Sequence, residues 1–528
     1  MSMIKIFKFR ANDLNPSAGK QIEFNTAVSK DFFHFLNDRE TIVCHYIDAN
    51  GKEKNVIESG LSLSPARGDY KIYQNSNGKP NLKDFFLKTL HLTIEKNGDD
   101  YFALRQREGN HYDLFYFPYS INITDLYSSL SLNRNEFQIN DILEIDLDNI
   151  NDNNKPYTIA LRSKPFMILA GISGTGKSRI VREFAYMTCS KELQDEDGTT
   201  PGNYCMIEVK PNWHDSTELL GYYSAMNKEY MFTKFDRFVV KAWLNPKTPF
   251  FVCLDEMNLA PVEQYFAEFL SVLETRSRDN EGDITSGALI EAKYFDDSSK
   301  MVKDLGLDEA TGECAIKVRE HIVNNGLTLP PNLMIIGTVN MDDTTYQFSR
   351  KVIDRAMTIE MNGGELKNMF GNSKNLQYRA DPIGLSAFKA RYLNADEVVE
   401  SHPDHENRIK ELLPQKIEEL NKMLEYTPFQ VSYRVLNELV VYTGVLLDEA
   451  KAKGEEIEFE LIAAKAFDQI TLMKILPRIE GDEDMFIRGG QNVLVHLQSL
   501  FAPESASHKK LTEMKERLDR TRFTRFWP

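Results

Sequence analysis

Residues 167–185, MILAGISGTGKSRIVREFA, place a glycine-rich turn between an apolar run and a segment with helical periodicity. Within this stretch, residues 171–178 match the phosphate-loop pattern G-x-x-x-x-G-K-[ST] at every fixed position. Residues 165–170 read as a short buried strand, and residues 179–187 read as the helix that follows the loop. Because strand, loop and helix occur in this order, the sequence predicts a site for a nucleoside triphosphate. An ordinary glycine-rich turn is the alternative.

Each residue type of the loop has a chemical reason to be there. Glycines permit positive φ, so successive backbone N–H groups can point at an anion, and the following helix adds the positive end of its dipole. Lys177 is expected to reach the β- and γ-phosphates, and the Ser178 hydroxyl is expected to bind Mg²⁺. We therefore predict that Mg²⁺ binds together with GTP or ATP. The predicted nucleotide-binding residues of the loop are Gly171, Ser173, Gly174, Thr175, Gly176, Lys177 and Ser178.

Length and composition indicate a soluble multidomain protein. The 528 residues exceed what one hydrophobic core accommodates and suggest three or four domains. Hydrophobic residues make up 42% and charged residues 27% of the chain, and no apolar run approaches the ~20 residues of a membrane helix. The start lacks a secretory signal, and the five cysteines lack C-x-x-C spacing. We expect a cytoplasmic protein with neither a zinc site nor a disulfide framework, and no membrane association.

The formal net charge of −16 is unevenly distributed. Residues 1–140 carry 17 basic and 17 acidic side chains, so the remainder of the chain holds the entire acidic excess. This balance argues against a protein that coats nucleic acid through bulk charge, whereas a basic lining inside a ring would not appear in the total. Net charge therefore neither supports nor excludes DNA as a partner.

Three regions differ in their sequence patterns. Residues 1–150 contain short β-type runs broken by Asn, Gly and Asp, with Asn50-Gly51 as a hairpin turn, and are interpreted as a β-rich recognition domain for DNA or another partner. After a polar linker at residues 146–157, residues 156–362 alternate apolar strands with helical segments, as a parallel α/β sheet does. Residues 363–528 turn helical. We predict an α/β fold: a phosphate-loop core with a parallel sheet, a C-terminal helical lid and a β-rich N-terminal domain.

Two further apolar runs end in polar side chains. Residues 250–254 lead into Asp255-Glu256. An acid at the carboxyl end of such a strand lies beside the phosphate loop, so we assign Asp255 to the metal and Glu256 to activation of the attacking water. Residues 332–340 end at Asn340, whose side chain can orient water against the γ-phosphate. A strand that simply ends in two solvated acids is the alternative for Asp255-Glu256.

Three arginines follow these strands. Arg350 and Arg355 fall on a predicted helix at the edge of the core, and Arg434 falls at the start of a helix in the C-terminal region. Taken singly, each arginine is better explained as a surface or salt-bridge residue. They follow the phosphate loop, the paired acids and Asn340 along the chain, and in this order all of these residues form one set.

This order resembles the AAA+ class, in which Walker A, Walker B, a sensor-one asparagine (here Asn340), an arginine finger and a sensor-two arginine follow one another. The segments DEMNLAPVEQYFAEFLSVLE, GTVNMDDTTYQFSRKVIDRA, KILPRI and FTRFWP more narrowly resemble the McrB family, the motor subunit of modification-dependent restriction, which is related to MoxR and dynein-like ATPases. The resemblance covers roughly residues 156–528. It implies NTP hydrolysis in a homo-oligomeric ring, expected as a hexamer, with a separate McrC-like nuclease subunit as partner.

The resemblance also assigns roles to individual residues. It implies catalytic roles for Asp343 and for Arg355, the expected arginine finger, with Arg350 as the second choice, and it makes Arg434 the nucleotide-binding sensor-two arginine. One position departs from the family: its Met-Asn-x-x-Asp-Arg signature keeps the asparagine and Asp343 here but has Thr344 at the arginine position. This departure leaves the choice between GTP and ATP open.

Other motifs have simpler interpretations. Asp283, Glu291 and Lys293 loosely resemble the acidic-Lys metal site of restriction nucleases, but a solvated insertion explains that segment better. Cys44-His45 lacks further spaced ligands for a metal. Trp213 lies near the place where many ring motors carry a substrate-facing loop, yet core packing is its better-supported role.

Two functions compete at this point. The first is an NTP-driven ring subunit that recognises modified or foreign DNA through residues 1–150 and drives a separate nuclease in antiviral defence. The second is a MoxR-like or dynein-related ATPase that remodels a protein complex, with residues 1–150 as a protein-binding module. A non-hydrolysing, nucleotide-gated scaffold is disfavoured by Asp255-Glu256.

Overall fold

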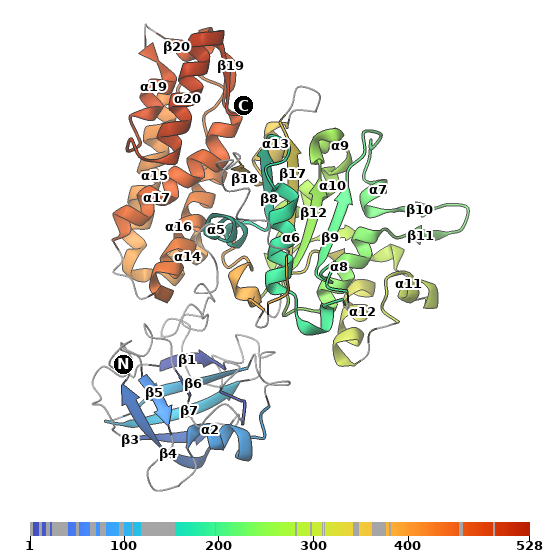
Figure 1. The fold of residues 1–528 in the computed structure, drawn as a ribbon, viewed down its shortest axis with the longest axis vertical. Coiled ribbons are helices and arrows are strands. Elements are labelled where there is room, and N and C mark those ends of the chain that lie inside the picture. Colours follow the sequence, from blue (N-terminus) through green and yellow to red (C-terminus); the bar gives the residue numbers. More distant parts are fainter. Residues whose placement is uncertain are drawn as a thin grey trace. The chain divides into compact units, whose positions relative to one another are not determined.

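In the computed structural model the chain forms two compact units, one of Met1–Ile145 with Leu447–Ile457 and the other of Asp146–Leu446 with Glu458–Pro528 (Figure 1). Among the described residues, no helix combines the length and the apolar character that a bilayer span requires. The structure describes residues 4–9, 13–16, 22–23, 41–48, 52–63, 70–73, 81–93, 100–107, 109–117, 154–195, 197–279, 282–295, 298–308, 310, 312–341, 348–361, 376–379, 382–453, 458–488 and 491–527.

The first unit contains a seven-stranded sheet, which confirms the β-rich character predicted for this region. The strands lie in the order β1 (Ile4–Lys8), β6 (Tyr101–Gln106), β7 (His111–Phe117), β3 (Thr41–Ile47), β4 (Glu53–Leu63), β5 (Tyr70–Tyr73) and β2 (Ile22–Glu23). Among the strand pairs that the described residues form in this sheet, β3–β7 is the parallel one and the others are antiparallel. β3 pairs with β4 as the predicted hairpin requires, although Asn50-Gly51 itself lies outside the described residues.

An aromatic core holds this sheet together. α2 (Leu82–Asp84) runs directly into the π-helical turn η1 (Phe85–Thr89), which buries Phe85 and Phe86. The Phe86 ring lies 4.8 Å from Phe9 and 5.2 Å from Phe102, centroid to centroid. Buried aromatic rings contribute large apolar areas, so this cluster gives the first unit a core of its own.

The second unit is built on a five-stranded parallel sheet, as predicted. The order is β18 (Met357–Glu360), β8 (Phe166–Gly171), β17 (Leu333–Asn340), β12 (Phe250–Asp255) and β9 (Tyr204–Glu208). The three central strands of such a sheet are buried on both faces, which explains why β8, β17 and β12 are nearly continuous apolar runs. Its carboxyl ends share one edge, where α/β proteins bind their ligands.

Helices cover both faces of this sheet (Figure 1). Successive side chains of a strand point to opposite faces, so Phe250 packs on Phe238 of α8 (Lys234–Leu244), whereas Phe251 faces Phe184 of α6 (Lys177–Thr188). α10 (Ala267–Val272) lies on the α8 face, because its Phe269 contacts Phe166 and belongs to the same core. The sequence order of strands and helices therefore becomes a three-layer arrangement.

Several short strands and helices lie between the strands of the parallel sheet in the sequence. A hairpin of β10 (Tyr222–Ser224) and β11 (Glu229–Met231) follows α7 (Thr217–Leu220). The pairs β13 (Ser277–Arg278) with β14 (Ile284–Thr285) and β15 (Ala288–Ile290) with β16 (Leu327–Thr328) precede β17, together with α11 (Ser299–Asp304) and α12 (Glu313–Asn325).

The predicted linker, residues 146–157, is wrong at its end, because α5 (Lys155–Ser163) begins within it. Pro156 lies in the first turn of α5, where the missing N–H of proline costs nothing.

The C-terminal region is helical, as predicted. Its main helices are α14 (Ala395–Ser401), α15 (Glu406–Met423), α16 (Tyr433–Lys453), α17 (Phe459–Ile470), α19 (Val493–Gln498) and α20 (Ala506–Thr521). A small antiparallel pair of β19 (Glu480–Asp482) and β22 (Phe523–Arg525) brings the end of the chain back onto these helices. The boundary between residues 156–362 and 363–528 stays a prediction, because residues on both sides of it belong to one compact unit, Asp146–Leu446 with Glu458–Pro528.

Asp236 in α8 links the stability of the core to pH. Its buried carboxyl accepts hydrogen bonds at Oδ2 from the Thr233 backbone N–H (2.7 Å) and hydroxyl (3.0 Å), but Oδ1 has no partner. Burial raises the pKa of Asp236 from 3.8 to about 7. The folded chain then keeps a proton that the unfolded chain releases, so the contribution of Asp236 to stability decreases as pH rises from about 4 to about 7.

We expect Asp236→Asn to remove this pH dependence. As the pH rises from about 5 to about 8, the urea midpoint of the wild-type chain should decrease relative to that of the variant. The reason is that only the wild type must bury a charge at the higher pH. Unfolding curves of the two full-length proteins at both pH values provide the measurement. A difference between the proteins that stays constant with pH contradicts this account.

Candidate active site

The phosphate loop leaves β8 and enters α6 through two glycines in the left-handed region. Gly174 has φ of 83° and Gly176 has φ of 85°, which an L side chain rarely adopts, and Gly176 is the N-cap of α6. Gly171 is required for a different reason: a Cβ there would lie 2.4 Å from the carbonyl oxygen of Met361, which follows β18. The loop is thus shaped by its glycines, and the first turn of α6 opens toward it.

Lys177 is held inside the loop. The side chain is only 7% exposed, and its Nζ donates hydrogen bonds to the carbonyl oxygens of Gly171 (3.1 Å) and Ile172 (2.7 Å). Thr175 Oγ1 closes the turn by donating to the Ile172 carbonyl (3.0 Å), and Ser173 is exposed on the same loop. A buried ammonium beside α6's N-terminus is a preformed contact for an anion, so the loop fits a phosphate chemically.

Asp255 lies next to Ser178 at the carboxyl end of β12. Its Oδ1 accepts hydrogen bonds from Ser178 Oγ (2.5 Å) and from Thr338 Oγ1 (2.7 Å). A hydroxyl and a carboxylate oxygen are the hard donors that Mg²⁺ takes from proteins. The pair predicted to hold the metal is therefore brought together, and its donor set fits that ion.

Glu256 and Asn340 meet across β12 and β17. Asn340 Nδ2 donates to Glu256 Oε1 (2.9 Å), and the Glu256 backbone N–H donates to Thr338 Oγ1 (3.0 Å). Glu256 has φ of 53°, the left-handed region, so the chain turns sharply directly after Asp255. Asn258 Nδ2 bonds to the Asn340 carbonyl oxygen (3.0 Å). These bonds fix the orientation of the Glu256 carboxylate at the loop edge.

Sequence reasoning missed Thr338 and Asn258. Thr338 receives the Glu256 N–H and donates to Asp255, so it joins the two acids. A signal was present: Thr338 and Asn340 are two residues apart on one strand and therefore point to the same face. A polar residue inside the apolar run 333–339 indicates a partner of this kind.

The three arginines make contacts away from the phosphate loop. Arg355 lies just after α13 (Arg350–Ile353) and not within a longer helix. Its guanidinium donates to the carbonyl oxygens of Leu270 (3.1 Å) and Lys351 (2.9 Å) and forms an ion pair with Glu274 (2.7 Å). Arg434 pairs with the same Glu274 oxygen at 2.5 Å. The predicted finger and the predicted sensor-two arginine thus share one carboxylate in the isolated chain.

Arg350 and Asp343 are the remaining predicted site residues. Arg350 donates to the Pro428 carbonyl oxygen (2.8 Å), and its guanidinium lies 5.3 Å from the centroid of the Phe429 ring. Asp343 and Thr344 lie outside the described residues. The structure therefore gathers the loop, Asp255, Glu256 and Asn340 at one edge, and does not bring the arginines to it.

The other motifs of the sequence have ordinary partners. Lys293 pairs with the exposed Glu291 (2.6 Å), whereas Asp283 pairs with Lys389, so Asp283 does not join the other two nuclease-like residues in one ion pair. Trp213 is buried and its ring packs edge-on against Tyr265 (5.3 Å between centroids), which confirms its core role. His45 hydrogen bonds to Glu53 and His111 within the first unit.

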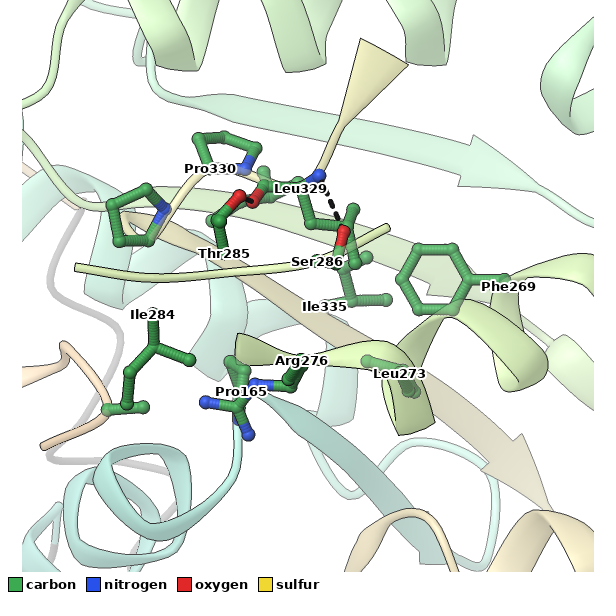
Figure 2. Close-up of a pocket in the computed structure, with 13 residues that line it drawn as sticks. Pro165, Phe269, Leu273, Arg276, Ile284, Thr285, Ser286, Leu329, Pro330 and Ile335 are labelled. Carbon is green, nitrogen blue, oxygen red and sulfur yellow. Dashed lines mark hydrogen bonds between the residues drawn. The ribbon is translucent and has the colours of Figure 1, made fainter. Parts of the chain in front are cut away.

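A small pocket lies at the opposite edge of the parallel sheet (Figure 2). Pro165, directly before β8, and Leu333, at the start of β17, line it together with Arg276 and Leu273. The phosphate loop follows β8 instead of preceding it. This pocket is therefore separate from the candidate nucleotide site.

Comparisons with known protein families give two matches within the second unit. Residues 166–289 match the family described as "AAA domain (dynein-related subfamily)", and residues 383–523 match a "Domain of unknown function (DUF8727)". No curated protein matches the chain.

Two solved structures are distantly similar. One is a candidate ATPase from Cytophaga hutchinsonii, 13% identical, with 61% of this chain and 80% of that chain covered and a TM-score of 0.32. The other is the SCCmec type IV Cch active helicase, 10% identical, with 82% of this chain and 75% of that chain covered and a TM-score of 0.26. On the family match, residues 166–289 of this chain form an AAA domain of the dynein-related subfamily.

Proposed function

We propose that this chain hydrolyses a nucleoside triphosphate, ATP or GTP, with Mg²⁺ at the carboxyl edge of its parallel sheet. One observation carries the proposal. Hydrogen bonds run from Ser178 through Asp255 and Thr338 to Glu256 and Asn340, beside the phosphate loop. This set contains the groups that bind a metal, activate water and orient the γ-phosphate.

The residues divide the work of hydrolysis. Ser178 and Asp255 would hold Mg²⁺, which supplies positive charge against the β- and γ-phosphates when bound. Lys177 exchanges the loop carbonyls for phosphate oxygens and orients them together with the loop N–H groups. Glu256 takes the proton of the attacking water, and Asn340 holds the Glu256 carboxylate in the orientation that this step needs.

We extend the proposal to a biological role: the motor subunit of a McrBC-like restriction complex in the cytoplasm. In this role residues 1–150 recognise DNA, and the ring drives a separate McrC-like nuclease in antiviral defence. The McrB-like segments of the sequence and the compact β-rich first unit support this role. The alternative, remodelling of a protein complex, is favoured by the dynein-related AAA match.

DNA binding by the full-length chain separates these two roles. We would measure filter binding to methylated, unmodified and phage DNA, with NTP hydrolysis followed in the same samples. A restriction motor should prefer one DNA class and hydrolyse faster on it, without cutting it alone. Hydrolysis that none of the three DNAs changes supports the remodelling role. Metal-dependent cleavage by the pure chain, abolished by Lys293→Ala, contradicts the division of labour with a separate nuclease.

We expect nucleotide to promote assembly of the chain into a ring, with a hexamer as the expected form. If neighbouring subunits complete each other's sites, specific activity should rise with protein concentration. Mass photometry at micromolar protein, with a slowly hydrolysed nucleotide analogue, provides the measurement. Lys177→Ala by itself is the control that should not assemble in response to nucleotide, although its subunits can still join rings formed by subunits that bind nucleotide. Monomers alone, in the presence of bound analogue, would count against a ring motor.

A further inference from the structure

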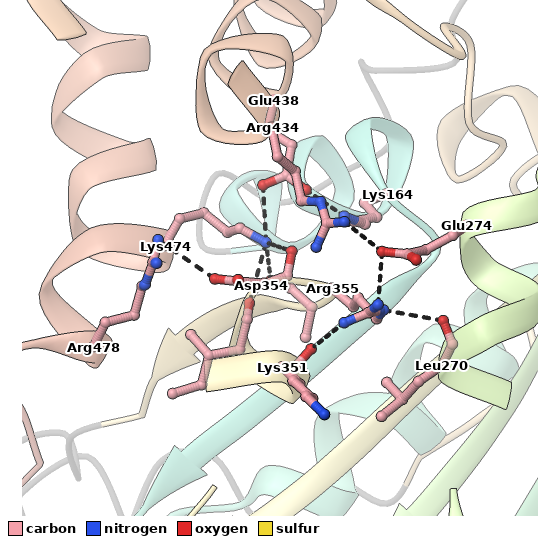
Figure 3. A network of polar contacts seen from close by, with 12 residues as sticks. Lys164, Leu270, Glu274, Lys351, Asp354, Arg355, Arg434, Glu438, Lys474 and Arg478 are labelled. Carbon is pink, nitrogen blue, oxygen red and sulfur yellow. Dashed lines mark hydrogen bonds and ion pairs between the residues drawn. The ribbon is translucent and has the colours of Figure 1, made fainter. Parts of the chain in front are cut away.

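A buried lysine of the helical region holds the turn that carries Arg355 (Figure 3). Lys474 is 1% exposed, and its Nζ donates to the carbonyl oxygens of Ile353 (3.1 Å), Asp354 (2.7 Å) and Ala356 (2.8 Å). These are the last carbonyls of α13 and of the turn after it, which lack partners within the helix. Lys474 of the helical region therefore holds residues 353–356 in place.

The segment that carries Lys474 is itself unusual. α17 ends in a π-helical turn, η10 (Thr471–Ile475), which is followed by the short 3₁₀ helix η11 (Leu476–Arg478). Arg478 also pairs with Asp354 (3.4 Å). π-helical turns are rare overall, but those that occur are often found at functional sites. Here Lys474 on η10 and Arg478 on η11 both contact the turn after α13.

The helix α16 is connected to Arg355 by two indirect routes, one through Lys474 and one through Glu274. On α16, Glu438 forms an ion pair with Lys474 (2.8 Å), and Arg434, one helical turn earlier, pairs with Glu274, which also pairs with Arg355. The first route acts on the backbone around Arg355, and the second acts on its guanidinium. A shift of α16 would therefore change both the turn and the side chain.

We infer that Lys474 is a positioning residue that transmits the position of α16 to Arg355. This inference rests on the proposed function, in which Arg355 serves NTP hydrolysis. Misplacing a group by about 1 Å can reduce a rate by about 100-fold even when the change lies away from the chemistry. Losing Lys474 should therefore impair turnover without removing any group that binds nucleotide.

Lys474→Met is the appropriate variant because it leaves no unpaired charge behind. Burial opposes ionisation of Glu438, but Lys164 and Lys474 together hold the pKa of its carboxyl below the usual range. Lys164 forms its own ion pair with Glu438, so the carboxylate keeps a cation in the variant. Removing Glu438 instead would leave two lysines without their counter-ion, which is the more damaging change.

Lys510→Met is the control for packing, and a demanding one, because it also removes the cation beside the buried Glu360 carboxylate. Lys510 is also buried and also joins the helical region to the sheet, through ion pairs with Glu360 at the end of β18 (2.8 Å) and with Glu513 (3.0 Å). It lies on α20 and makes none of the contacts to the turn at residues 353–356. A general loss of packing between helices and sheet should affect both variants alike.

The experiment compares NTP turnover, nucleotide affinity and ring assembly of the wild type, Lys474→Met and Lys510→Met. We expect kcat of Lys474→Met to fall by about 10- to 100-fold, KM to stay within about threefold, and Lys510→Met to keep most of its turnover. Mixing Lys474→Met with Lys177→Ala subunits should restore part of the activity, because the first supplies an intact nucleotide site and the second an intact Arg355 turn.

Three results would overturn the inference. They are wild-type turnover by Lys474→Met, equal losses in Lys474→Met and Lys510→Met, and a loss of affinity as large as the loss of kcat. Absence of hydrolysis by the wild type itself, in the same assay, would instead defeat the proposed function. The two failures are therefore distinguishable.

Discussion

Arg355→Ala is expected to reduce NTP turnover by on the order of 10³-fold or more, while nucleotide affinity changes only a few fold. An arginine finger stabilises charge that develops in the transition state, and such groups contribute about 10³ to 10⁵ in rate, or roughly 4 to 7 kcal/mol. The structure adds a condition. Arg355 is 17% exposed and paired with Glu274, so it must leave that carboxylate to reach the γ-phosphate of a neighbouring subunit.

Mixed rings measure whether Arg355 acts across an interface. Arg355→Ala lacks the finger but binds nucleotide, whereas Lys177→Ala lacks nucleotide binding but keeps its finger. Rings that contain both variants should recover part of the activity, because each supplies what the other lacks. Steady-state hydrolysis over a range of mixing ratios, with ring formation checked by mass photometry, gives the result. If mixed rings form and remain inactive, Arg355 does not act in the neighbouring subunit.

Arg350→Ala is the comparison for this experiment. Arg350 bonds to the Pro428 carbonyl and stacks on Phe429, so its guanidinium already serves a contact between α13 and the C-terminal region. We expect a smaller loss of turnover than for Arg355→Ala. The opposite ranking would move the finger from Arg355 to Arg350.

The fold and the centre of the site could be predicted because their signals are local. The three central strands of the parallel sheet, β8, β17 and β12, are short apolar runs. Asp255 and Asn340 each stand at the end of one of these strands. Parallel strands then bring these ends together without further information. The phosphate loop adds a spacing that few other structures require.

The contacts of the arginines could not be predicted because they depend on pairs far apart in the sequence. Glu274 lies 160 residues before Arg434, and Lys474 lies 120 residues after Asp354. No periodicity connects such positions, and a single glutamate or lysine in a charged chain is usually solvated. Only the folded chain shows that Glu274 pairs with two arginines and that Lys474 is buried.

Glu256→Gln should slow hydrolysis by about 10²- to 10⁴-fold and leave nucleotide binding with Mg²⁺ nearly unchanged. Glutamine keeps an oxygen that can accept the hydrogen bond of Asn340, so the geometry of the edge should persist. The amide cannot take a proton from water. The phosphate loop, Ser178 and Asp255 are untouched, and these are the residues proposed to hold the nucleotide and the metal.

Glu208→Gln is the control that makes this result specific. Glu208 ends β9 beside Asp255 and is exposed, yet it is not part of the hydrogen bonds that join Asp255, Thr338, Glu256 and Asn340. Single-turnover hydrolysis and equilibrium nucleotide binding should show near-normal behaviour for Glu208→Gln, a slow step with normal binding for Glu256→Gln, and lost binding for Lys177→Ala. Near-normal hydrolysis by Glu256→Gln would remove Glu256 as the base and leave water activation to another group at this edge.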